Sequence, residues 1–111
     1  MKKIDEVLAG CRSVAILGHV HPDGDCVGSC LGLYHYIRKR MPEAETDVYL
    51  EPFPKEFAFL NGADRVRHEF DTEKVYELCI VCDASDRQRL GKGAEILDRA
   101  DRTVSIDHHK T

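Results

Sequence analysis

Carboxylate and imidazole side chains gather in three short clusters of this 111-residue chain: residues 19–25 (HVHPDGD), 83–86 (DASD) and 107–109 (DHH). A donor set that is rich in oxygen and imidazole and lacks thiolates suits Mn²⁺ or Mg²⁺-like ions better than structural zinc. Two divalent ions can clamp a phosphoryl group and deliver a hydroxide, because a bound metal lowers the pKa of its water. The chemistry that these residues indicate is hydrolysis of a phosphate ester.

Each cluster follows an apolar run that predicts a β-strand. We expect strands at residues 13–18, 47–51, 78–82 and 103–106. We expect helices at residues 2–11, about 26–41, 54–60 and 93–100. This alternation predicts βαβ units, and so an α/β fold with a mostly parallel sheet and flanking helices. Parallel sheets bind ligands beyond the carboxyl ends of their strands, and all three clusters fall there.

Five side chains in the clusters are candidate metal ligands. Asp23 and Asp25 are two residues apart in an expected loop, so they point in different directions and can serve different ions. His19, at the end of the first strand, can fold onto the same ion as Asp23. Asp83 comes from another strand and could bridge both ions, and His108 comes from a third.

Each cluster taken alone has an ordinary structural interpretation. An Asp-Gly-Asp sequence is commonly a turn, and Asp25 is placed to cap the helix that follows. Asp83 alone would fit an Asx turn, and the pair His108 and His109 alone would fit an exposed surface. The three clusters together, each after a strand, favour a metal site.

The bulk composition limits the classes of function. A chain of 111 residues is expected to form one domain. A net charge of -4 and a pI of about 5.8 exclude a protein that holds nucleic acid by bulk electrostatics, although bound cations still allow a nucleotide substrate. We expect no signal peptide, since Met1 leads into an acidic amphipathic stretch, and no run approaches the ~20 apolar residues of a membrane span. We therefore expect a cytoplasmic protein with no membrane partner.

Five cysteines, at positions 11, 26, 30, 79 and 82, include one CxxC pair. This pair lies inside an expected buried strand, which favours small core residues over a zinc or redox site. Reduced thiols of this kind fit the cytosol. Gly28 and Gly32 lie four residues apart in an expected helix, and we expect them to allow close packing of that helix on the sheet.

The three clusters resemble the motifs of the DHH phosphoesterase family. Residues 19–29 (HVHPDGDCVGS) resemble the first motif, HxxPDGDxxGS. Residues 80–85 (IVCDAS), followed by RLG at 89–91, resemble the second, and residues 105–109 (SIDHH) resemble the third, which names the family. The three motifs in this order and spacing are far more specific than a lone DxD. The resemblance covers almost the whole chain and implies a Rossmann-like three-layer domain.

Carried over residue by residue, the resemblance implies two bound Mn²⁺ ions, with Mg²⁺ or other divalent ions as alternatives. His19, Asp23 and Asp83 would hold one ion. Asp25, Asp83 and His108 would hold the other, so that Asp83 bridges the pair.

Two further residues of the third motif have implied catalytic roles. Asp107 would not bind a metal itself but would hydrogen-bond to metal ligands and fix their orientation, as such partners do. His109 would lie near the scissile phosphate and help to stabilise its charge. Arg89, with Arg87 and Lys92, could bind substrate phosphate, although a solvated loop explains this basic cluster equally well.

The Gly-Asp-x-x-Gly-Ser form of the first motif resembles the branch that degrades nanoRNA, 3′-phosphoadenosine 5′-phosphate, or linear and cyclic dinucleotides. The implied function is a manganese-dependent hydrolase of small nucleotides or short RNA. Family II inorganic pyrophosphatases, which typically carry Thr where this chain has Gly24, are an alternative. A metal-dependent nucleotide-binding module without turnover is another.

Members of the family continue past the third motif. A fourth motif supplies a further Asp to the second ion, and a C-terminal DHHA1 domain grips the substrate; neither is present in residues 1–111. We therefore expect residues 1–111 to be the N-terminal part of a longer protein. A homodimer is one possible assembly of that full-length protein. Residues 1–111 alone are expected to hydrolyse poorly, and to be less stable than the parent or to associate, because the sheet near residues 103–106 would lack cover.

Overall fold

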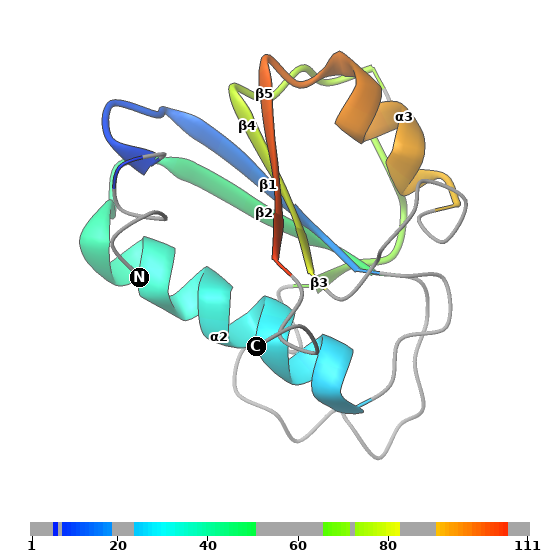
Figure 1. Cartoon of the computed structure of the whole chain (residues 1–111), viewed down its shortest axis with the longest axis horizontal. Coiled ribbons are helices and arrows are strands. Elements are labelled where there is room, and N and C mark those ends of the chain that lie inside the picture. Colours follow the sequence, from blue (N-terminus) through cyan, green and yellow to red (C-terminus); the bar gives the residue numbers. More distant parts are fainter. Residues whose placement is uncertain are drawn as a thin grey trace.

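Five parallel strands form one sheet in the computed structural model of the chain, in the order β3-β2-β1-β4-β5 (Figure 1). The structure describes residues 6, 8–18, 24–50, 66–71, 73–82 and 91–106. The strands are β1 (Ser13–Leu17), β2 (Glu45–Tyr49), β3 (Val66–Arg67), β4 (Leu78–Cys82) and β5 (Arg102–Ile106). The helices are α2 (Gly24–Arg40) and α3 (Gly93–Arg99). The predicted parallel α/β fold is confirmed.

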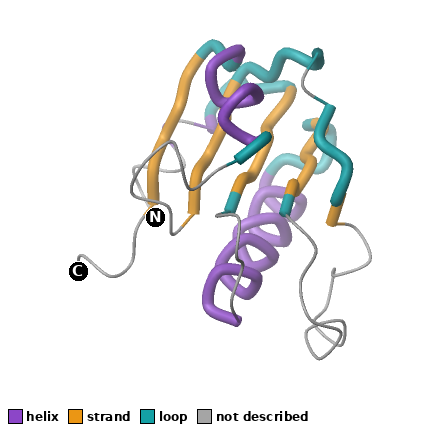
Figure 2. Tube along the Cα trace, turned by 90° about the vertical axis from the view of Figure 1, so that its right-hand side faces the viewer, coloured by secondary structure: helices purple, strands orange, loops and turns teal. Residues whose placement is uncertain are grey.

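The strand β4 and, after Ser13, the central strand β1 consist of buried apolar residues, because helices cover both faces of the sheet. Successive side chains of a strand point to opposite faces. In β1, Val14 and Ile16 accordingly join one buried cluster, whereas Ala15 and Leu17 join another on the other face. Figure 2 shows α2 and α3 on these opposite faces, so the molecule has three layers.

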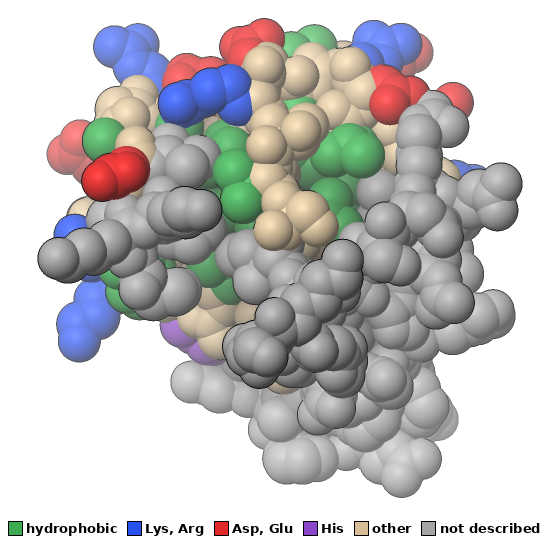
Figure 3. Space-filling view, viewed as in Figure 1, with side chains coloured by type: hydrophobic (Ala, Val, Ile, Leu, Met, Phe, Trp, Pro, Cys, Tyr) green, Lys and Arg blue, Asp and Glu red, His purple; other side chains and the backbone are tan. Residues whose placement is uncertain are grey.

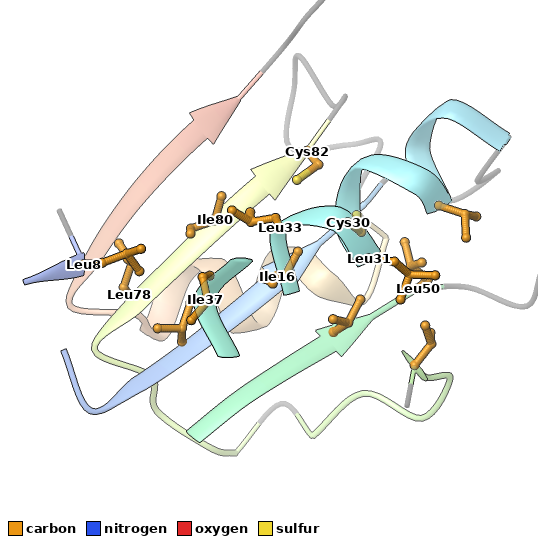
Figure 4. Close-up of a cluster of buried hydrophobic side chains, with 14 of the residues drawn as sticks. Leu8, Ile16, Cys30, Leu31, Leu33, Ile37, Leu50, Leu78, Ile80 and Cys82 are labelled. Atoms are coloured by element: carbon orange, nitrogen blue, oxygen red, sulfur yellow. The ribbon is translucent and has the colours of Figure 1, made fainter. Parts of the chain in front are cut away.

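The larger core cluster lies between the sheet and α2 (Figure 4). Three side chains of this helix, Val27, Leu31 and Ile37, are at most 3% exposed. They pack with Ile16 and Ile80 from the centre of the sheet. Leu8, which precedes β1, also belongs to this cluster and is helical, as is Glu6. The rest of the helix predicted at residues 2–11 is not helical at 9–11 or lies outside the described residues.

The smaller cluster lies on the α3 face of the sheet. Ala94 and Ile96 of α3 pack there with Leu17, Tyr49 and Val81. This short helix begins and ends close to the predicted bounds. The strands predicted at 13–18, 78–82 and 103–106 agree with β1, β4 and β5 to within one residue at each end.

Three details of the secondary structure differ from expectation. The helix α2 begins at Gly24, two residues earlier than predicted, so Asp25 lies in its first turn and not at the capping position. Helix boundaries of this kind are set by local hydrogen bonds, which an apolar pattern does not locate. The strand β2 also begins two residues early, at Glu45. The two-residue strand β3 was not predicted, because it is too short to show a periodicity. The helix predicted at 54–60 lies outside the described residues.

The expected packing role of two helical glycines is wrong. Gly28 and Gly32 are exposed, and a Cβ at either position would meet no described atom within 4 Å. The face of α2 that packs on the sheet instead carries the large apolar residues, as the burial of Leu31 and Ile37 shows.

The CxxC cysteines are core residues, as predicted. Cys79 and Cys82 are buried with free thiols, and they belong to clusters on opposite faces of the sheet. Three residues of separation in a strand point two side chains in opposite directions, so this pair cannot grip one metal ion. Burial, with a smaller effect of the neighbouring Cys82, raises the pKa of the Cys79 thiol to about 12.

The strand β5 forms one end of the sheet and is thinly covered. Thr103 and Ser105 are exposed, and Val104 is only half-buried. Figure 3 shows hydrophobic side chains at the surface on both sides of this strand. Among the described helices, none has the length and apolar character needed to cross a membrane.

Candidate metal and substrate site

Three neighbouring strands bring the three clusters to one edge of the sheet. The strands β1, β4 and β5 are adjacent and parallel, so their carboxyl ends share one edge. Their ends are also level, since Leu17 pairs with Val81 and Cys82 pairs with Ile106. The first cluster begins two residues after Leu17, and the other two begin directly after Cys82 and Ile106. The predicted meeting of the three clusters therefore has the strand arrangement that it requires.

The direction of chain progression reverses between β1 and β4. From β1 the chain passes through α2 to β2 and on to β3 at one end of the sheet, then crosses to β4 on the other side of β1 (Figure 1). In open α/β sheets, the crevice at such a reversal, outside the carboxyl ends, is where ligands bind. The first two clusters follow the two strands that flank this crevice.

The predicted site residues themselves lie almost entirely outside the described residues. These are the metal ligands His19, Asp23, Asp83 and His108, the catalytic candidates Asp107 and His109, and the substrate candidate Arg89. Asp25 is the second residue of α2, and its side chain is likewise outside the description. Their roles, and the bound metals, stay predictions.

Described residues near this edge are compatible with a site of oxygen and nitrogen donors. Cys82, the last residue of β4, is 2% exposed and packs in the core on the α2 face, so its thiol is buried. Within the described part of the chain, no group of three or more His, Cys, Asp or Glu is placed to hold a metal. The helix α2 runs back along the sheet from this edge, so the positive end of its dipole faces the side where anions would bind.

A polar network on the α3 face could not be predicted from the sequence. The hydroxyl of Tyr76 lies 2.6 Å from that of Tyr49 and donates to Asp47 Oδ2 at 2.5 Å. Arg67 Nη1 donates to the Tyr49 hydroxyl at 3.2 Å, and Lys74 pairs with Asp47 at 3.3 Å. Burial, and then the hydrogen bond to Asp47, raises the pKa of Tyr76, and burial raises the pKa of Tyr49. The network joins β2, β3 and the segment before β4.

His68 is the described imidazole at the carboxyl edge that sequence reasoning passed over. It follows the last residue of β3, is exposed, and has Nδ1 2.9 Å from the carbonyl oxygen of Leu50, the residue after β2. The sequence placed it in a polar loop without a role. Because β3 has only two residues, nothing in the sequence indicated that a strand ends there.

The sequence is similar to those of known proteins, and this similarity identifies its family. A model of the DHH family, N-terminal domain, matches residues 13–111. The chain belongs to the DHH family. A bifunctional oligoribonuclease and PAP phosphatase NrnA of Bacillus subtilis (strain 168) is 36% identical over 98 residues, covering 82% of this chain and 27% of the relative. A cyclic-di-AMP phosphodiesterase GdpP of Geobacillus thermodenitrificans (strain NG80-2) is 30% identical over 118 residues, covering 95% of this chain and 18% of the relative.

A solved structure shares the fold of this DHH chain. An exopolyphosphatase-related protein from Bacteroides fragilis superposes with a TM-score of 0.84 and 22% sequence identity, covering 99% of this chain and 34% of that one. At this identity the likeness concerns the fold alone. The chain spans about a third or less of the length of these three proteins.

Proposed function

We propose that this DHH chain is the metal-binding part of a phosphoesterase that hydrolyses phosphate esters of small nucleotides. The observation that carries the proposal is the level, adjacent placement of the carboxyl ends of β1, β4 and β5, each followed by a family motif. The relatives are named for oligoribonucleotides, PAP and cyclic di-AMP, which supports a nucleotide substrate.

Five side chains of the motifs would hold the metals. His19 and Asp23 would bind one manganese ion, Asp25 and His108 would bind the other, and Asp83 would bridge the two. When bound, the ions lower the pKa of a water molecule and so supply the attacking hydroxide. Asp83 is the residue that both halves of the site share, so its loss should be the most damaging.

Three further residues, Asp107, His109 and Arg89, would position the metal ligands or contact the substrate. Asp107 would fix the orientation of neighbouring ligands by hydrogen bonding. His109 would donate to an oxygen of the scissile phosphate and so stabilise the charge that develops there. Arg89 would contact a phosphate of the substrate.

The decisive assay measures hydrolysis of pApA and of 3′-phosphoadenosine 5′-phosphate by the whole gene product with Mn²⁺. We expect Asp83→Ala to lower kcat by at least about a hundredfold, because the shared ligand is lost. Asp86→Ala removes a carboxylate of the same cluster that is not a proposed ligand, and it should retain activity. Equal rates for the Asp83→Ala and wild-type proteins would sink the proposal.

A parallel measurement of bound manganese separates catalysis from binding alone. Elemental analysis should find two ions per wild-type chain and fewer in the Asp83→Ala protein. A wild-type protein that binds manganese and pApA but forms no product would be a binding module. Hydrolysis of pyrophosphate, with neither nucleotide cleaved, would instead assign the protein to the pyrophosphatases.

A further inference from the structure

The outer edge of β5 offers backbone hydrogen-bonding groups to a partner. Arg102 N donates to Glu77 O beside β4, so the alternation of a parallel ladder turns the N–H and C=O groups of Thr103 and Ser105 away from the sheet. Both residues are exposed, and of the strands that the structure describes none lies on this side of β5. The edge can therefore accept a further strand.

Apolar surface accompanies this edge on both faces of the sheet. Val104 packs against the core cluster on the α2 face but is only half-buried. Hydrophobic side chains reach the surface on both sides of β5 (Figure 3). A single added strand would leave part of this surface in water, whereas a folded partner with its own sheet and apolar flanks would cover it.

The two edges of the sheet differ in how they are protected against pairing. Soluble proteins commonly protect an edge by keeping the strand short, or with Lys, Pro or a bulge. The strand β3 is only two residues long. The strand β5 (RTVSI) is five residues long, contains neither Pro nor Lys, and has its one charged residue at its start. The sheet is therefore open to pairing at the β5 end.

The sequence of β5 is complementary to itself when two copies run antiparallel. A closed assembly of two identical chains has a twofold axis, and such an axis perpendicular to the sheet makes the two edge strands antiparallel. Centred on Val104, the pairing overlaps the whole of β5 and sets Thr103 opposite Ser105 of the second copy. These are the residues whose backbone groups face outward, so each such pair exchanges two hydrogen bonds. The two Val104 side chains meet on the α2 face.

We propose that two copies of the chain dimerise by antiparallel pairing of their β5 strands, with Val104 on the twofold axis. The two sheets join into one continuous sheet, and the apolar surfaces beside both strands are buried together. The carboxyl ends of the two sets of parallel strands then lie at opposite edges of that sheet, so the two candidate sites stay separate. The inference does not depend on the proposed function, since it rests on the β5 edge alone.

Disulfide cross-linking of the whole gene product tests this register. Across the twofold axis the two Val104 Cα atoms lie about 4.5 Å apart, which a disulfide spans. Two residues at position 103 are diagonal neighbours about 7–8 Å apart, which is beyond that reach. Under mild oxidation we expect Val104→Cys to form a disulfide-linked dimer on a non-reducing gel, and Thr103→Cys to stay monomeric. The wild-type protein, whose described cysteines are buried, gives the background.

A second pair of variants tests the backbone pairing without a new thiol. Thr103→Pro removes an outward N–H, and an edge strand tolerates proline where its N–H faces solvent, so circular dichroism should show a folded monomer. Thr103→Val keeps the N–H. In sedimentation equilibrium we expect dimers for the wild-type and Thr103→Val proteins, and a dimerisation Kd at least about tenfold higher for Thr103→Pro.

Three results would overturn the proposal. One is a wild-type protein that sediments as a monomer at every concentration. Another is equal cross-linking of Val104→Cys and Thr103→Cys, which indicates random collision. The last is a dimer that Thr103→Pro leaves as tight as the wild type, because that dimer uses another surface.

Discussion

At the scale of single residues, Tyr76 has the most demanding environment that the structure describes. Its side chain is fully buried, and its hydroxyl meets both the Tyr49 hydroxyl and the carboxylate of Asp47. A buried polar group is costly when its partner is removed, because the group left behind is neither solvated nor paired. The Asp47 side chain is only 19% exposed and also pairs with Lys74. Partners in this network therefore take the place of part of the water around its carboxylate.

We expect Tyr76→Phe to lower the free energy of unfolding by about 1–3 kcal/mol, since it leaves Asp47 and Tyr49 without a shared partner. Urea denaturation followed by circular dichroism gives the value. The control is Tyr34→Phe, at a half-buried ring that packs edge-on against His35, which should change stability by less than about 0.5 kcal/mol. Equal unfolding free energies for Tyr76→Phe and wild type would show that the network contributes nothing.

At the scale of elements, the sequence predicted those whose signal is local. The apolar runs of β1 and β4 indicated buried strands, and they are buried on both faces. The positions of β3 and of the Asp47 network depend on contacts between residues far apart in the chain, which no local pattern contains. The glycines of α2 show the opposite failure, because a four-residue spacing indicated a packing face where the helix is exposed.

That exposed position gives an element-scale prediction. We expect Gly32→Ala to stabilise the protein by about 0.5–1 kcal/mol, because alanine favours the helix and its Cβ meets no described atom within 4 Å. Thermal unfolding measures the change. The matched variant Ile37→Ala truncates a fully buried side chain of the same helix and should cost about 2–5 kcal/mol. A destabilised Gly32→Ala protein would mean that another surface covers this face of α2.

At the scale of the whole molecule, the sheet has unequal ends. At one end, β3 is only two residues long; at the other, β5 is five residues long. Arg102 N donates to Glu77 O on the side of β4, so the alternation of a parallel ladder turns the backbone groups of Thr103 and Ser105 outward. Within the described residues, no further strand pairs with them. The placement of the three clusters beyond the carboxyl ends of parallel strands followed from the sequence. The adjacency of β1, β4 and β5, and this unpaired edge, depend on strand order, which only the structure supplied.

An open edge of this kind promotes association between chains. We expect residues 1–111 alone to gain apparent mass with concentration in light scattering, and the double variant Thr103→Lys, Ser105→Lys to reduce that gain. Glu95→Lys on α3 changes the net charge by the same amount away from this edge and should behave as the unsubstituted chain. A chain that stays monomeric at all concentrations would refute the prediction.

The central position of β1 has a consequence for the order in which the protein is built. One flank of β1 pairs with β2, which follows through the single helix α2, whereas the other flank must wait for β4, more than 60 residues further along the chain. The step that pairs β4 with β1 also brings the carboxyl end of β4, which the second motif follows, beside the carboxyl end of β1. If the chain binds the metals proposed above, a cell that supplies them during synthesis would help this late closure, because ions held by both motifs would bind the closed sheet and not its half-built precursor.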